Sequence, residues 1–468
     1  MIETRTVDYI PEEERHGAPR DLFFVWFGAN MNMTTLVTGA LLFTLGLSLF
    51  WSVLAILTGV AIGSILVAAH AVQGPRLGIP QMIQSRAQFG VYGAIVPMLL
   101  VMFIYFGYSV SNTLIVTQSL SGVVPWSKAA IVIMFSGLTC LIALIGYRLI
   151  HATQRWLTWI SILLFGIVAA RLLSHALSPA LWLPAPVSPK LVFIGVGLTA
   201  TFTLSCAPYV ADYSRYLPSH VSSQRVFWAT YAGMALSMSS LMLIGALLAA
   251  ETSGVMDNAG GHLAALFGPF SALLYGLIVY GLLCINVFNF YGAFMAVITT
   301  VQPFGRVRVT RAWRAITLGA VTVGTIAFSL WGQGNFADLF LKFIFLMSYA
   351  LIPWTAINLV DYYFLRRGRY EIEAIFDPDG TYGRFNPVAI AAFLISIAAE
   401  VPFISDPFYT GPLARALGSI DLAWLVGVLV GAASYYLPMR LRLSRRMSYP
   451  PAPVNESGSA HASGALRP

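Results

Sequence analysis

The sequence predicts an all-helical membrane protein whose chain crosses the bilayer twelve times. Of its 468 residues, 58% are apolar and only 10% are charged, whereas soluble chains carry about 25% charged residues. Apolar segments of about 20 residues, the length that spans the hydrocarbon core, follow one another along most of the chain. The basic residues fall in alternate connections between these segments. One polytopic domain accounts for all three observations.

The apolar segments define twelve expected spans joined by short connections. Several exceed about 20 residues, which indicates tilt, a kink or an end outside the membrane. We expect a cytoplasmic segment over 1–21, the membrane domain over 22–440, and a disordered cytoplasmic tail over 441–468 that is rich in Pro, Ser, Ala and Gly. The expected spans are 22–45, 47–70, 93–120, 128–147, 156–175, 190–211, 226–250, 266–300, 313–332, 335–364, 386–404 and 419–438.

The basic residues set the expected orientation. If the N-terminus is cytoplasmic, most of the 27 lysine and arginine residues fall on the cytoplasmic side, as the positive-inside rule requires. Both termini are therefore expected in the cytoplasm, and the short loops favour a bacterial inner membrane. The net charge of +8 belongs to these loops. It does not indicate nucleic-acid binding, because no basic run is interleaved with exposed aromatic residues.

Two of the spans carry small and polar residues where an ordinary helix would be apolar. The first has Gly28-Ala29-Asn30-Met31-Asn32 in its first half, and the sixth has Ser205-Cys206-Ala207-Pro208 in its second half. Backbone freed at membrane depth is tolerated where it is buried or lines a cavity, and such breaks mark binding sites in secondary transporters. Two broken helices five spans apart predict an inverted five-plus-five repeat. A membrane-embedded enzyme is disfavoured because the acidic residues are scattered over different loops.

Polar side chains inside the spans are candidates for the binding site. Asn286 and Asn289 lie on one helical face, and their amides suit a ligand edge with alternating N–H and C=O groups. The alternative is that they link helices. Tyr105-Phe106-Gly107 offers an aromatic face for a flat ring, or ordinary core packing.

Two further polar stretches lie at the cytoplasmic ends of spans. Asp212 and Arg215 follow Pro208 and could form an ion pair that gates the site. The alternative is a helix-end charge pair worth only a few tenths of a kcal/mol. The polar segment Gly74–Gly90 is expected to form a turn followed by a short interfacial helix.

The stretch after Pro208 resembles the signature of the nucleobase:cation symporter-1 family, in its purine–cytosine permease branch. The resemblance covers about residues 20–440 and is carried mainly by Ala211-Asp212-Tyr213-Ser214-Arg215-Tyr216. Weaker matches that agree with it are Gly74-Pro75-Arg76-Leu77-Gly78, Tyr105-Phe106-Gly107, Asn289-Phe290-Tyr291 and Asp361-Tyr362-Tyr363 before Arg366-Arg367.

This resemblance implies a fold and an activity. The fold would be the leucine-transporter type, a five-plus-five inverted repeat with two extra helices. The activity would be symport of a nucleobase such as cytosine or a purine by alternating access, with no cofactor, no metal site and no catalysis. The same fold with another flat solute stays open, namely allantoin or a hydantoin, thiamine or its pyrimidine moiety, or a B6 vitamer.

The resemblance also implies roles for individual residues. Tyr105 would stack on the substrate ring, Ser109 would reach the ligand one turn later, and Asn289 would hydrogen-bond the base. Asn286 would assist from one turn before Asn289. The implied unwound, substrate-facing stretches are Phe27, Gly28, Ala29 and Asn30 in the first span, and Phe202, Thr203 and Ser205 in the sixth.

One departure from the family bears on the coupling ion. Sodium-coupled relatives place Ser or Thr hydroxyls just before the Asn pair, where this chain has Leu282, Leu283, Cys284 and Ile285. Neither a leucine nor a thiol is a good ligand for a hard cation. The sequence therefore favours protons over sodium as the coupling ion.

Overall fold

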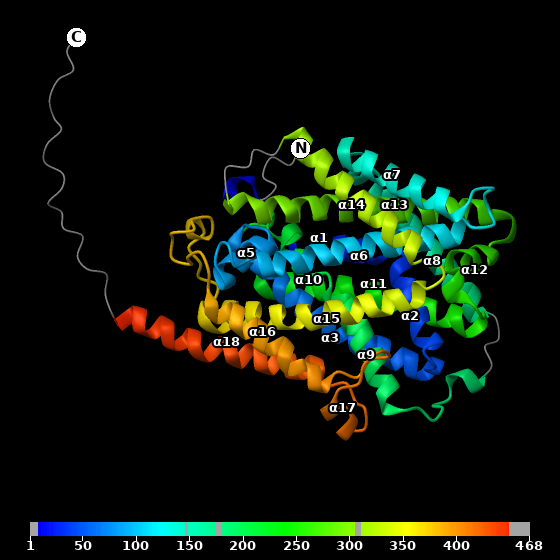
Figure 1. The fold of residues 1–468 in the computed structure, drawn as a ribbon. Coiled ribbons are helices and arrows are strands. Elements are labelled where there is room, and N and C mark those ends of the chain that lie inside the picture. Colours follow the sequence, from blue (N-terminus) through cyan, green and yellow to red (C-terminus); the bar gives the residue numbers. More distant parts are fainter. Residues whose placement is uncertain (1–7, 146–147, 175–178, 305–309, 449–468) are drawn as a thin grey trace, which may run out of the picture.

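The computed structural model describes residues 8–145, 148–174, 179–304 and 310–448, which form a bundle of helices (Figure 1). Nine of the described helices are long and apolar enough to cross a membrane. Three shorter apolar helices, Met33–Thr44, Trp159–Ser174 and Pro387–Phe403, lie where three more spans are expected. The all-helical prediction is confirmed, and the count of twelve crossings stays a prediction.

The helices follow the expected spans closely. Each of the first and sixth spans is divided into two helices, and short helices form the connections. The helices are α1 (Pro19–Asn30), α2 (Met33–Thr44), α3 (Leu49–Ala71), α4 (Gln73–Leu77), α5 (Gln81–Phe89), α6 (Ile95–Leu120), α7 (Lys128–Ile145), α8 (Arg148–Ser174), α9 (Pro189–Leu204), α10 (Ala207–Ser214), α11 (Ser223–Glu251), α12 (Ala259–Ala265), α13 (Ser271–Val301), α14 (Arg311–Trp331), α15 (Phe336–Val360), α16 (Pro387–Glu400), α17 (Pro412–Ala416) and α18 (Ala423–Ser448).

The break in the first span lies at Met31 and Asn32, between α1 and α2. The Asn32 amide satisfies both broken ends, because its Nδ2 donates to the Ala29 carbonyl (3.0 Å) and its Oδ1 accepts from the Thr35 N–H (3.1 Å). The expectation that Phe27 to Asn30 are unwound is wrong, since these residues form the last turn of α1. Because the Asn32 side chain caps the chain at the break, α1 stays helical as far as Asn30.

The break in the sixth span lies at Ser205 and Cys206, between α9 and α10. Pro208 follows as an early residue of α10, where its missing N–H costs no hydrogen bond. The Ser205 hydroxyl donates to the Phe202 carbonyl (2.6 Å) and bonds the Tyr108 hydroxyl of α6 (2.7 Å). Phe202 and Thr203 were expected to be unwound and are instead the end of α9.

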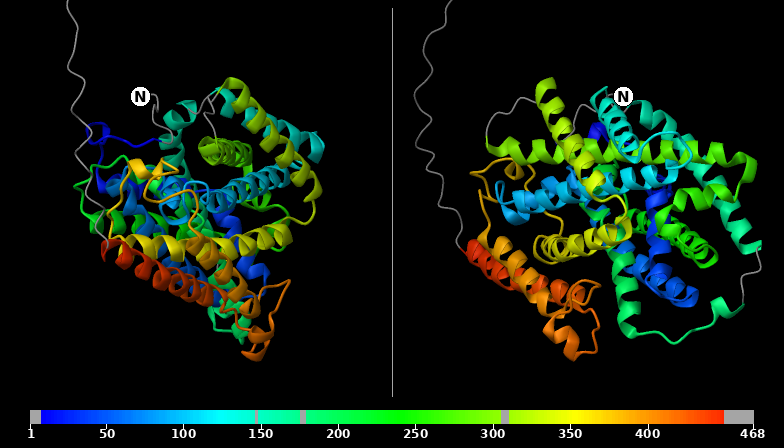
Figure 2. Two further views of the ribbon diagram at one scale, coloured as in Figure 1. Left: turned by 60° about the vertical axis from the view of Figure 1, so that its left-hand side comes forward. Right: turned by 45° about the vertical axis from the view of Figure 1, so that its right-hand side comes forward.

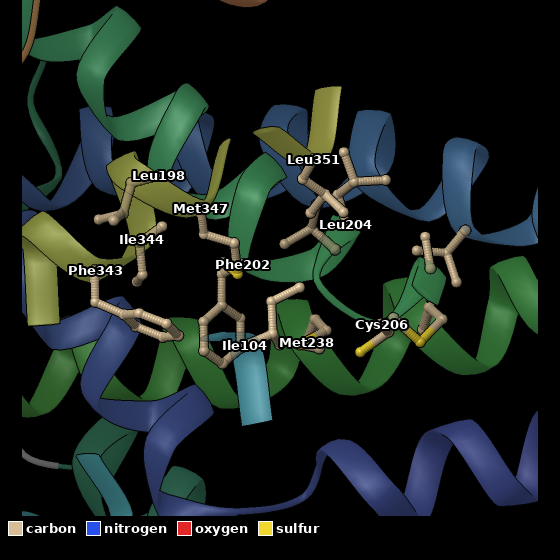
Figure 3. Packing of buried hydrophobic residues seen from close by; sticks show 14 of the residues in the cluster. Ile104, Leu198, Phe202, Leu204, Cys206, Met238, Phe343, Ile344, Met347 and Leu351 are labelled. Carbon is tan, nitrogen blue, oxygen red and sulfur yellow. The ribbon is translucent and has the colours of Figure 1, made fainter. Parts of the chain in front are cut away.

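The broken helices are held by close packing against α3 and α11. A Cβ added at Gly245 of α11 would overlap the Leu36 carbonyl of α2, and one at Gly39 would overlap the Met242 backbone. Glycine at such crossings lets helix backbones approach closely in membranes. Figure 3 shows the apolar side of this region, where Phe202 lies among side chains that include Ile104 and Phe343. These contacts fix the positions of the two breaks.

Helices α16 and α18 pack against each other at one edge of the bundle, as two views agree (Figure 2). The buried Asp361 carboxylate, at the end of α15, joins α18 to the rest of the bundle. It accepts from the hydroxyls of Tyr370 (2.7 Å) and Tyr435 (2.9 Å) and pairs with Arg366 (3.1 Å). Helix α18 runs to Ser448, and the expected domain end at 440 stays a prediction. Residues 449–468 of the expected tail lie outside the described residues.

The segment Gly74–Gly90 departs from expectation in its burial. It does form a short helix, α5, but every residue from Gln81 to Phe89 is buried within the protein. The helix is therefore enclosed by other parts of the protein, and its expected position at the membrane interface stays a prediction. Its polar side chains find partners on helices that are distant in sequence, which a local hydropathy pattern cannot reveal.

Candidate functional site

A cavity of about 1860 Å³ begins at the two helix breaks. It extends along α10 to the side of the bundle that carries the N-terminal segment, residues 8–18. Residues from α1, α6, α9, α10 and α13 line its inner part. The cavity is larger than a single small ligand needs, about 300–1,000 Å³, so its outer part serves as a vestibule.

Tyr105 of α6 provides the flat aromatic surface of this cavity. Its ring stacks on that of Tyr209 from α10, with ring centres 5.7 Å apart and planes 27° apart. It also lies against the α13 backbone, since a Cβ added at Gly292 would overlap the Tyr105 ring. Gly292 thus leaves room for the aromatic pair one turn after Asn289. The two rings form an aromatic wall of the cavity against which a planar ring can pack, and we call this part of the cavity the aromatic slot.

Asn289 carries an unused hydrogen-bond donor inside the cavity, as Trp26 does with its indole Nε1. It is 8% exposed, it lines the cavity, and its Nδ2 has no hydrogen-bond partner among the described residues. A buried amide donor left unpaired costs about 1–3 kcal/mol. A ligand with an acceptor at this point would recover that free energy.

Asn286, one turn earlier on α13, has a different role. It is fully buried, its Oδ1 accepts from Asn112 Nδ2 (2.9 Å), and its Nδ2 donates to the Ser109 carbonyl (3.2 Å) and the Thr113 hydroxyl (3.3 Å). Thr34 of α2 donates to Asn112 in turn. Asn286 therefore links α13 to α6 and α2, and the prediction that it contacts the ligand is not supported by its position.

Several other predicted residues lie away from the cavity. Ser109 is buried and its hydroxyl donates to the Tyr105 carbonyl (2.8 Å). Thr203 bonds the Thr199 carbonyl within α9 (2.8 Å), and Phe27 stacks on Phe23. The predicted residues that do line the cavity are Ala29, Asn30, Tyr105, Phe202, Ser205, Asn289, Asp212 and Arg215, whereas Phe27, Gly28, Ser109, Thr203 and Asn286 do not.

Side chains that line the same space without having been assigned to the site from the sequence include Trp26, Tyr108, Cys206 and Tyr209. Trp26 of α1 contacts both Tyr209 (6.2 Å between ring centres) and Tyr213 (5.3 Å), so the two broken helices meet through aromatic rings. A signal for Tyr209 was present, because it directly follows Pro208 at a helix break.

Asp212 and Arg215 lie along the wall of the vestibule. The Asp212 Oδ1 accepts from the backbone N–H of Gln81 (2.8 Å), while Arg215 Nε donates to the backbone carbonyl of Asp212 (3.3 Å). Arg215 Nη1 also donates to the Asp8 carbonyl (3.3 Å). The expected gating ion pair between these two side chains stays a prediction.

The N-terminal segment borders the mouth of the vestibule. Ile10 N–H donates to the Gly78 carbonyl (2.9 Å), and His16 N–H donates to the Tyr216 carbonyl (2.7 Å). Glu12 accepts from the backbone N–H and the hydroxyl of Ser219, and these donors hold the pKa of its carboxyl below the usual value. The mouth is therefore flanked by ordered chain.

A second, small cavity of about 40 Å³ lies between the first helix break, α8 and α13. Leu282, Cys284 and Ile285, on which the sequence-based expectation about the coupling ion rests, all line it. Among its lining side chains only Asn32 and Ser161 carry oxygen atoms, and the Asn32 oxygen already accepts from Thr35.

Comparison with known proteins identifies the chain. The family model described as "Permease for cytosine/purines, uracil, thiamine, allantoin" matches residues 9–427. The chain belongs to this permease family. It is therefore an integral membrane transporter and not an enzyme, as the sequence resemblance implied.

Two curated relatives show the range of similarity within the family. A Bacillus subtilis protein named putative purine-cytosine permease YxlA is 48% identical over 449 residues, which cover 96% of this chain and 98% of that protein. The Saccharomyces cerevisiae purine-cytosine permease FCY2 is 27% identical over 451 residues, covering 89% of this chain and 81% of the yeast protein.

Solved structures share the fold at low identity. The inward-facing conformation of Mhp1 aligns with a TM-score of 0.75 and 17% identity, covering 94% of each chain. Mhp1, titled a nucleobase-cation-symport-1 family transporter, in a closed conformation with bromovinylhydantoin bound, aligns with a TM-score of 0.71 and 17% identity, covering 95% of this chain and 96% of that one. The predicted leucine-transporter-type architecture is confirmed.

Proposed function

We propose that the chain imports a planar nucleobase, cytosine or a purine, by proton-coupled symport across a bacterial cytoplasmic membrane with both termini in the cytoplasm. The observation that carries this proposal is the Asn289 Nδ2, which has no partner among the described residues and lines the same cavity as the stacked Tyr105–Tyr209 rings. The names of the curated relatives, purine-cytosine permeases, support the same substrate class.

The geometry supports a flat, hydrogen-bonding solute. An asparagine amide can form two hydrogen bonds with the ring nitrogen and exocyclic amine of adenine, and cytosine presents a comparable pair of adjacent groups. The Tyr105 ring supplies stacking of about 1 kcal/mol for an aromatic partner. Because no charged side chain is needed for these contacts, a neutral base suits the slot.

Accumulation of a neutral base requires a coupling cation. Moving one positive charge inward supplies about 2.3 kcal/mol per 100 mV, which corresponds to roughly forty-fold accumulation. Sodium is a hard cation that prefers several oxygen ligands, and the small cavity beside α13 is lined mainly by Leu282, Cys284, Ile285 and other apolar side chains. This lining favours protons as the coupling ion.

Uptake of labelled cytosine, adenine and hypoxanthine into cells that express the chain tests the proposal. We expect saturable uptake that a protonophore abolishes and that is unchanged when sodium is replaced by choline. Unlabelled allantoin, hydantoin, thiamine and pyridoxine serve as competitors. Uptake that needs sodium would overturn the coupling assignment, and competition by a vitamin or hydantoin with no base uptake would overturn the substrate class.

Tyr209 provides a sharper test of the slot. We expect Tyr209→Ala to raise the KM for the base by about three- to tenfold, because losing an aromatic contact costs up to about 1.5 kcal/mol. The matched variant Tyr209→Phe keeps the ring and removes only the hydroxyl that bonds Cys206 (3.4 Å), so its KM should stay within about twofold of wild type. Equal KM values for both variants would exclude stacking on Tyr209.

A further inference from the structure

Helix α5 combines a polar sequence with complete burial. Its nine residues include Gln81, Gln84, Ser85, Arg86 and Gln88, and all nine are buried. It lies at the end of the bundle beside α10 (Figure 1), with which it packs. Burying so many polar groups is unfavourable unless each has a partner, so the contacts of α5 indicate what the helix holds in place.

The N-terminal end of α5 is tied to the substrate helix α10. The Asp212 carboxylate accepts from the Gln81 N–H, the first amide of α5 (2.8 Å). The first amides of a helix lack intrahelical acceptors, and the helix dipole favours a negative charge there. Asp212 follows Tyr209 by three residues, so a shift of α10 moves the aromatic slot and this contact together.

The C-terminal part of α5 is tied to the other substrate helix, α13. Arg86 Nη2 donates to the Thr299 carbonyl in the last turn of α13 (3.0 Å), and its guanidinium lies 5.7 Å from the Phe376 ring centre. Burial lowers the pKa of Arg86 to about 10, so the side chain stays charged at neutral pH. A cation at a helix C-terminus is favourable. Thr299 lies on the same helix as Asn289, about 15 Å further along.

Two more contacts fix α5 to the surrounding helices. Trp354 Nε1 of α15 donates to the Ser85 hydroxyl (3.0 Å). Gln81 Nε2 donates to the Gln73 Oε1 of α4 (3.3 Å), and Gln73 donates to Asn358 of α15 (2.7 Å). These hydrogen bonds fix the position of α5 against α4 and α15. The two ends of α5 contact α10 and α13, the two helices that form the substrate slot.

We propose that α5 couples the two sides of the substrate site, with Asp212 and Arg86 as positioning residues that hold α10 and α13 in the state whose cavity reaches the N-terminal segment. The role of these contacts in transport rests on the proposed function. A contact shifts a conformational equilibrium only if it differs between the states. The Asp212–Gln81 and Arg86–Thr299 hydrogen bonds are both formed in the state with the long vestibule. Removing either bond should therefore lower the population of that state.

The native Cys206 reports on this state, because it lines the cavity. The test uses the full chain with Cys140→Ala and Cys284→Ala, in membrane vesicles treated with N-ethylmaleimide. We expect Asp212→Ala and Arg86→Gln each to slow Cys206 labelling and to lower the maximal uptake rate by about tenfold, with KM within about twofold, a change equivalent to roughly 1.4 kcal/mol. The double variant should be no slower than the worse single variant, because both act through one helix.

Conservative variants guard against simple misfolding. Asp212→Asn keeps an oxygen acceptor and Arg86→Lys keeps a charged donor, so both should label and transport at rates between those of wild type and the severe variants. The matched control Arg384→Gln removes an exposed arginine that pairs with Asp379 and should change neither rate. Labelling that stays at the wild-type rate, or rises, in properly inserted Asp212→Ala or Arg86→Gln would overturn the proposal. Because labelling needs no substrate, this outcome is separate from a failure of the nucleobase assignment.

Discussion

Replacing Asn289 with alanine is expected to abolish measurable nucleobase uptake while leaving the protein folded in the membrane. The substrate would then enter the aromatic slot with its polar edge unpaired, at a cost of about 1–3 kcal/mol for each unsatisfied group. Loss of two such contacts corresponds to a reduction of about a hundredfold in the specificity constant. Initial uptake rates, normalised to the amount of transporter in the membrane, measure the effect.

Asn286 supplies the contrast that makes this result specific. Asn286→Ala would leave Asn112 and Thr113 without their buried partner, so we expect a lower melting temperature and a lower yield. Asn289→Ala should keep the melting temperature of wild type, because its Nδ2 has no partner among the described residues to lose. Undiminished uptake by a well-expressed Asn289→Ala protein would remove this residue from the site.

Replacing Gly245 with valine is expected to prevent formation of the stable transporter. The added side chain would overlap the Leu36 carbonyl, so α2 and α11 would have to separate at their closest crossing. Overpacking of a well-packed core costs about 1–3 kcal/mol, and here the obstacle is backbone, which cannot move aside alone. Fluorescence-detected size-exclusion chromatography should show aggregation or loss of the protein.

The matched control is Gly197→Val in α9. A Cβ there would meet no atom of the described residues within 4 Å, so the variant should elute and transport as wild type does. A Gly245→Val protein that elutes as a single folded species with normal uptake would show that the α2–α11 crossing is not close-packed in the functional transporter.

The fold could be predicted from the sequence because its main signals are local. Span positions follow from runs of apolar residues, and both helix breaks were expected within a few residues of where they occur. The exact break positions could not be read in advance, because they depend on individual side chains. Asn32 caps both ends of its break, and Ser205 bonds Tyr108 from a distant helix.

The site was harder to predict because spacing does not show which polar groups already have partners. Asn286 and Asn289 share a helix face. Asn112, which precedes Asn286 by 174 positions, donates a hydrogen bond to Asn286, whereas the Asn289 Nδ2 has no partner among the described residues. The same limit applies to the burial of α5. Its polar sequence gives no sign of burial, because Asp212 and Trp354 reach it only in the folded chain.

Helix α18 is a suitable site for fusing a partner protein for cryo-electron microscopy. It is a helix of 26 residues, about 39 Å long, and Arg442 near its end donates to Asn386 at the start of α16 (3.3 Å). Because this last part is tied to a neighbouring helix, a helical partner protein fused in register after Ser448 would share its axis. Such a fusion would give cryo-electron microscopy particles a rigid feature outside the detergent micelle for alignment.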